Sequence, residues 1–132
     1  MPYDHTIKVA GTFDETMEAV RHALADQGFG ILTEIDVRAT LKAKLDHDME
    51  PYPILGACNP PLARQALDAD RSIGLLLPCN VVVRTEGDQV IVQAIDPATM
   101  VTLTGVDAMA PVADEAARRL DAALATVAEG SA

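Results

Sequence analysis

The segment from Tyr52 to Arg84 constrains the fold of this chain more than any other part of the sequence. It holds two strongly apolar runs, and each run is closed or interrupted by a cysteine followed by an asparagine. The two pairs are Cys58-Asn59 and Cys79-Asn80, and they contain both cysteines of the protein. Polar residues embedded in runs that are otherwise apolar mark this segment as the place where a site would lie.

Length and composition set the limits of the fold. The 132 residues predict a single domain spanning 1–132, which is long enough to bury a core without a metal or a disulfide. Two Phe, two Tyr and no Trp mean that the core is built from aliphatic side chains. A formal net charge of −10 argues against nucleic acid as a partner, because a phosphate-binding surface needs clustered Lys and Arg.

The sequence also carries an expectation about the compartment. Its first residues are polar and include an acid where a signal peptide would be basic. No apolar run approaches the roughly 20 residues that a membrane helix needs, so no membrane partner is expected. We therefore expect a cytoplasmic protein, in which both cysteines are reduced thiols.

The first helix is predicted by its two ends. Thr12 and Glu15 have the spacing of a capping box, in which a hydroxyl and a carboxylate bind free backbone amides. An apolar stripe of helical period follows. Gly28 has the position of a left-handed residue after the last turn, and Phe29 can fold back onto Leu24.

The middle of the chain alternates strands and short helices. A half-buried strand is predicted from Phe29 to Val37, because its apolar residues recur with period two. Asp36 can cap a short helix that directs Val37, Leu41 and Leu45 inward. A strand over Tyr52–Cys58 comes next, and Asn59 followed by proline begins another helix.

Ile73–Arg84 is predicted to be one long strand that is apolar on both faces. Pro78 cannot donate a ladder hydrogen bond, so we expect a bulge or a free edge at Pro78-Cys79. A hairpin at Glu86-Gly87-Asp88 leads into a returning strand, Gln89–Asp96. The chain then forms a short helix that ends near Thr104 and a last helix over Pro111–Val127.

Together these elements predict an α+β fold, with a curved, mainly antiparallel sheet of about five strands and helices on one face. A strand that is apolar on both faces has to be covered twice, once by helices of its own chain and once from outside. We therefore expect a homodimer formed through the sheet or its edge, because a two-fold contact buries the same patch on both copies.

The chemistry of the two motifs leaves several alternatives open. Free cysteines are usually small buried hydrophobic residues, and both thiols fit that description. Cys58, however, precedes a helix start, where backbone dipoles favour a thiolate. If the two strands are neighbours, Cys58, Asn59, Cys79 and Asn80 converge on one ligand-binding site, and Cys58 and Cys79 could hold a soft metal.

The hypothesis that follows is a homodimeric module that binds a small molecule or a soft metal around the Cys-Asn motifs. Haem is not excluded, and the sequence specifies no cofactor. The competing hypotheses are an enzyme that uses Cys58 as a nucleophile or redox thiol, and a purely structural or protein-interaction role. No general base lies near Cys58 in the sequence, and no Cys-x-x-Cys, phosphate loop or dinucleotide fingerprint is present.

Five segments resemble the family called domain of unknown function 302. They are Gly28–Asp36, Ala39–Leu45, Ile54–Pro60, Gly74–Val81 and Ala94–Pro97, and the resemblance extends over nearly the whole chain. It implies a TBP-like β-α-β4-α fold with extra short helices, in small bacterial or archaeal proteins that tend to pair as dimers. It implies no activity.

Overall fold

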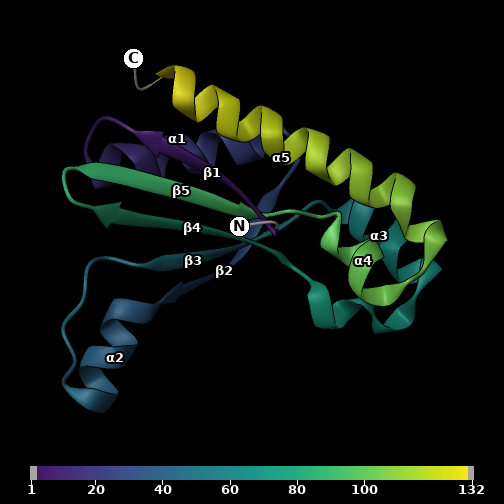
Figure 1. Ribbon diagram of the computed structural model, residues 1–132, viewed down its shortest axis with the longest axis horizontal. Coiled ribbons are helices and arrows are strands. Elements are labelled where there is room, and N and C mark those ends of the chain that lie inside the picture. Colours follow the sequence, from purple (N-terminus) through teal and green to yellow (C-terminus); the bar gives the residue numbers. More distant parts are fainter. Residues whose placement is uncertain (1–2, 131–132) are drawn as a thin grey trace.

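The computed structural model describes residues 3–130 and consists of one antiparallel sheet with helices around it (Figure 1). The strands are β1 (Asp4–Val9), β2 (Gly30–Asp36), β3 (Pro53–Cys58), β4 (Cys79–Glu86) and β5 (Gln89–Ile95). The helices are α1 (Phe13–Asp26), α2 (Val37–Leu45), α3 (Pro60–Ala69), α4 (Thr99–Thr104) and α5 (Ala110–Gly130), with 3-10 turns η1 (Arg71–Leu76) and η2 (Asp107–Met109). The sheet order is β1-β5-β4-β3-β2, and every pairing is antiparallel. The α+β architecture predicted from the sequence is thus confirmed.

Helix α1 has the two ends that the sequence predicts. The Thr12 hydroxyl accepts a hydrogen bond from the Glu15 amide at 3.1 Å. At the other end the amides of Gly28 and Phe29 donate to the carbonyls of Ala25 and Leu24, which is a Schellman ending. Gly28 has a φ of +85°, a conformation that side chains with a Cβ rarely adopt.

Alternation along the strands separates the sheet into two faces. Leu55, Val81, Val83 and Val92 have no exposed surface, and their face is covered by α1 and α5 (Figure 1). Burying each of these side chains stabilises the fold by about 1.5–3 kcal/mol. The opposite face of the sheet, which we call the open face, has no long helix over it. Its residues from β2 to β5 include Thr33, Ile35, Ile54, Gly56, Asn80, Val82, Arg84, Ile91, Gln93 and Ile95, of which Ile91 is buried.

A second hydrophobic cluster lies beyond one end of the sheet, where α3, η1, α4 and the first half of α5 meet (Figure 1). Ile73 and Met109 are completely buried in it. Among residues 3–130, no helix has the length and apolar character needed to cross a bilayer.

The prediction of one long strand over Ile73–Arg84 is wrong for its first half. Residues 71–76 form the 3-10 turn η1, and β4 begins only at Cys79. The Asp70 side chain caps this turn by accepting from the Ser72 amide at 3.0 Å, and Ile73 turns into the second cluster. The expected bulge or edge at Pro78-Cys79 is wrong too, because β4 is an inner strand and the sheet's register shift lies between Ile31 and Thr33.

The expected orientation of α2 is also wrong. None of its residues is buried, and Leu45, which was predicted to face the core, is 72 % exposed. The helix stands away from the body of the protein, at the ends of β2 and β3 (Figure 1). Its apolar residues Val37 and Leu41 are only partly covered, and among residues 3–130 the helix joins neither hydrophobic cluster.

Gly56 is required where the open face is most crowded. A Cβ at this position would lie 2.2 Å from Thr33 Oγ1 and 2.8 Å from Pro78 Cγ. We therefore expect Gly56→Ala to lower the free energy of unfolding by about 1–3 kcal/mol through overpacking. Urea unfolding followed by circular dichroism measures the change.

Gly74→Ala is the matched control for this substitution. Nothing lies within 4 Å of a Cβ built at Gly74, and its φ is not in the left-handed region. We expect it to change stability by less than about 0.5 kcal/mol. Equal stability of the two variants would show that Thr33 and Pro78 do not crowd Gly56.

Candidate ligand-binding site

The first Cys-Asn motif lies where β3 passes into α3. Asn59 is 5 % exposed and caps α3, because its Oδ1 accepts from the Leu62 amide at 3.4 Å. Its Nδ2 donates to the Gln27 carbonyl at the end of α1, at 3.3 Å. Arg119 of α5 donates to the same carbonyl at 3.2 Å. Asn59 is therefore held by hydrogen bonds that join three helices.

The second motif lies at the start of β4. Cys79 pairs with Ala57 of β3 and points into the main core, where it is 8 % exposed. Asn80, the next residue, points to the open face because successive side chains of a strand alternate. Its carboxamide has no hydrogen-bond partner among residues 3–130 and is exposed. The two asparagines therefore have opposite environments.

The two thiols lie close to each other. Both are free, and both line a cavity of about 20 Å³ between the two hydrophobic clusters. Burial, together with the nearby charge of Cys58, raises the pKa of the Cys79 thiol to about 11. This cavity has room for about one water or one small ion. No group of three or more His, Cys, Asp or Glu side chains within residues 3–130 is arranged to hold a metal ion.

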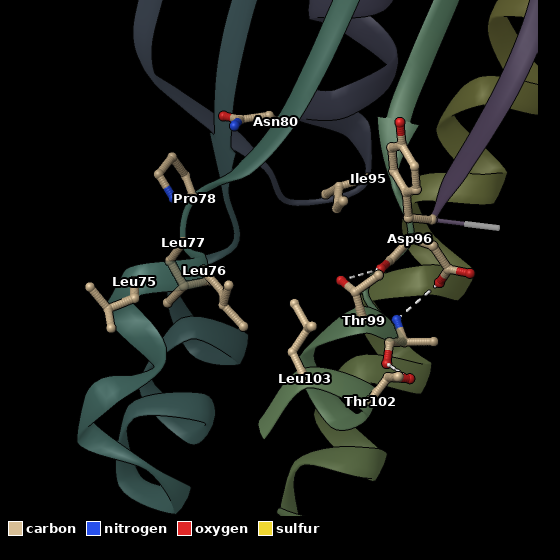
Figure 2. Close-up of a pocket in the computed structure, with 12 residues that line it drawn as sticks. Leu75, Leu76, Leu77, Pro78, Asn80, Ile95, Asp96, Thr99, Thr102 and Leu103 are labelled. Carbon is tan, nitrogen blue, oxygen red and sulfur yellow. Dashed lines mark hydrogen bonds between the residues drawn. The ribbon is translucent and has the colours of Figure 1, made fainter. Parts of the chain in front are cut away.

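A much larger pocket, of about 740 Å³, opens at one end of the open face. One wall is formed by the end of η1 and Pro78, and the other by α4, with Asn80 and Ile95 between them (Figure 2). Its lining residues are Tyr3, Leu75, Leu76, Leu77, Pro78, Asn80, Ile95, Asp96, Ala98, Thr99, Thr102 and Leu103. This volume lies in the range typical of small-molecule sites.

The polar groups of this pocket are few, and most of them are already engaged. The hydroxyls of Thr99 and Thr102 donate to the carbonyls of Asp96 and Ala98, at 2.8 and 3.2 Å. The Asp96 carboxylate accepts from the Ala98 amide at 2.9 Å and lies 3.4 Å from Nε2 of His5. Of residues 3–130, no Lys, Arg or His lines the pocket, and Asp96 is the one charged residue that does. The free groups are the carboxamide of Asn80 and the hydroxyl of Tyr3, neither of which has a hydrogen-bond partner among residues 3–130.

Leu77 separates the two spaces. Its side chain lines the large pocket and also the small cavity that the thiols share. Of the four residues singled out from the sequence, the structure brings Cys58, Asn59 and Cys79 around the small cavity and places Asn80 in the large pocket. The pocket walls were missed because Ile73–Leu77 was taken for strand; the Asp70-x-Ser72 capping pattern was the signal that could have revealed η1.

Comparison with known proteins agrees with this architecture. A family model described as "Domain of unknown function DUF302" matches residues 5–127. The chain belongs to the DUF302 family. A similar solved structure is the crystal structure of an uncharacterised conserved DUF302 protein from Bacillus stearothermophilus, with a TM-score of 0.89 and 28 % sequence identity. The similarity covers 96 % of this chain and 99 % of that one. A search of curated proteins found no match.

The different roles of the two asparagines can be measured. We expect Asn59→Ala to lower the free energy of unfolding by about 1–3 kcal/mol, because it removes a helix cap and leaves a buried carbonyl with one donor fewer. Asn80→Ala is the matched control and should change stability by less than about 0.5 kcal/mol. Urea unfolding of both variants checks this, and equal losses would contradict the structural role given to Asn59.

Proposed function

We propose that this DUF302 protein is a homodimeric module that binds a small, mainly apolar and uncharged molecule beside its second Cys-Asn motif. The observation that carries the proposal is the unpartnered Asn80 carboxamide in a pocket of about 740 Å³ with mainly aliphatic walls. A carboxamide both donates and accepts, so it suits an alcohol, ketone or amide group on the ligand. Sedimentation equilibrium at micromolar concentration tests the homodimer.

The charges around the pocket support an uncharged ligand. Carboxylates and phosphates are normally bound by Arg, Lys or backbone amides, and no basic side chain lines this pocket. Asp96 and the net charge of −10 disfavour an anion further. Burial of the ligand against Leu75, Leu76 and Ile95 supplies most of its binding free energy, and Asn80 orients its polar end.

Binding of an uncharged fluorophore, N-phenyl-1-naphthylamine, tests this proposal. We expect its fluorescence to rise on binding, and octan-1-ol to displace it more effectively than octanoate at pH 7. Asn80→Leu should weaken the affinity for octan-1-ol by about three- to ten-fold, which is the worth of one hydrogen bond.

Gln89→Leu is the matched control, because it makes the same kind of change at an exposed position on β5 outside the pocket. It should leave the affinity for octan-1-ol unchanged. Octanoate competing as well as octan-1-ol, or no loss of affinity in Asn80→Leu, would count against the proposed site.

Soft-metal binding by Cys58 and Cys79 is the second candidate function. It is favoured by one observation, namely that two free thiols line the same cavity. Two thiolates suit Cu(I), although the raised pKa of Cys79 means that the metal would have to displace a tightly held proton. A Cu(I) titration in competition with a chelator tests this function, with the double variant Cys58→Ala/Cys79→Ala as control. Equal Cu(I) uptake by the wild type and the double variant would show that the thiols are not the metal ligands.

The alternative function is a thiol-dependent enzyme that uses Cys58. Rates of alkylation in single-cysteine variants measure the reactivity of each thiol separately. In the Cys58→Ala variant we expect Cys79 to react slowly with iodoacetamide up to pH 9 or so, because burial, the larger cause of its raised pKa, remains. Adding Leu77→Ala should speed the reaction, since Leu77 stands between the thiol cavity and the open pocket. Fast alkylation of Cys79 with Leu77 intact would contradict this arrangement.

A further inference from the structure

Within residues 3–130, helix α2 contacts β3 but packs into neither hydrophobic cluster. It has nine residues, none of them buried, whereas isolated helices shorter than about 12–15 residues are marginal in water. Its Asp36 cap and its solvent-exposed Lys42–Asp46 ion pair are local interactions that stabilise the helix only weakly. Leu45 at its end is 72 % exposed. The apolar side of the helix is therefore largely open to solvent in the single subunit.

A second set of exposed aliphatic side chains lies at the mouth of the pocket. Leu75 is 88 % exposed and Leu103 is 69 % exposed, and they come from the two opposite walls (Figure 2). Tyr3, 49 % exposed, lies on the same pocket. Single exposed leucines are common on protein surfaces, but several on one rim mark a contact surface.

The charges of these two surfaces are complementary. Helix α2 carries three of the ten basic residues of the chain and none of its twenty acidic ones, and Lys42 is paired with Asp46 and Asp48 just beyond its end. Two of the three, Arg38 and Lys44, form no ion pair with any of residues 3–130. The pocket has Asp96 and no basic side chain in its lining. Like charges disfavour contact between two α2 helices, whereas contact between α2 and the pocket rim is favoured.

The positions of the two surfaces allow a symmetric exchange. The strand register places α2 at the Asp36/Pro53 end of the sheet and the pocket at the opposite end, near Asn80 and Ile95. Helix α2 lies on the side of the sheet away from α5 (Figure 1). Two copies can face each other across a two-fold axis that is perpendicular to the line from α2 to the pocket. This axis places α2 of each copy over the pocket of the other. Such a contact is isologous and closes as a dimer.

We infer that α2 of a second copy of this chain covers the mouth of the pocket, so that the binding site is completed by the partner subunit. This inference rests on the proposed homodimeric binding function and assigns its interface. The same arrangement covers the row of aliphatic side chains on the open face, Ile35, Ile54 and Val82, which are cross-strand neighbours between the two ends.

Sedimentation equilibrium of charged variants tests the interface. We expect the wild type to sediment at twice its 14.0 kDa and Leu45→Glu to shift toward the monomer, with the dimer Kd raised about ten-fold or more. Leu103→Glu on the pocket rim should have the same effect. Both leucines are exposed, so far-UV circular dichroism should show that both variants stay folded. Ala125→Glu, at an exposed position on α5, is the matched control and should remain dimeric.

A second substitution makes the test specific for contact between α2 and the rim. Adding Leu45→Lys to Leu103→Glu places opposite charges across the proposed contact, and it should recover dimer relative to Leu103→Glu alone. A monomeric wild type overturns the inference. A dimer that survives both Leu45→Glu and Leu103→Glu overturns it too, because the two copies would then meet elsewhere, such as at the β2 edges. Fluorophore binding distinguishes the two proposals: an Asn80→Leu variant with unchanged affinity defeats the ligand site even where Leu45→Glu abolishes the dimer.

Discussion

Packing of the aliphatic face of β3, β4 and β5 against α1 and α5 is the interaction on which the rest of this structure depends. Leu55, Val83 and Val92 are completely removed from solvent there. Because neighbouring residues of a strand point to opposite faces, burying Cys79 and Val81 in this core forces Asn80 onto the open face. The candidate ligand site is thus a consequence of how the core is packed.

The two Cys-Asn motifs meet at the boundary between the two hydrophobic clusters, but they have different tasks. One motif ends a strand before a helix, so Asn59 becomes a cap and joins α1 to α3 through the Gln27 carbonyl. The other begins a strand, so its asparagine has no helix to cap and stays free. The same dipeptide is structural in one place and available for a ligand in the other, because the backbone around it differs.

The open side of the molecule has an uneven distribution of apolar surface and charge. Its middle is lined by Ile54 and Val82, whereas its ends carry the basic helix α2 and the pocket beside Asp96. Aliphatic burial supplies affinity without direction, while one free carboxamide and a few charges supply orientation. In the proposed function, these features would combine a general apolar site with selection against anions.

Features that depend only on neighbouring residues could be predicted from the sequence. Helix α1 was predictable because the Thr12 cap and the Gly28 ending act within a few residues, and the strands because alternation with period two is local. Three other features became visible only in the folded chain. Ile73 turns into a second cluster instead of extending β4, α2 joins neither hydrophobic cluster, and Leu103 lies across a pocket from Leu75. These outcomes depend on contacts between segments far apart in the chain, and an apolar run has the same local pattern whether it ends in a strand or in a buried turn.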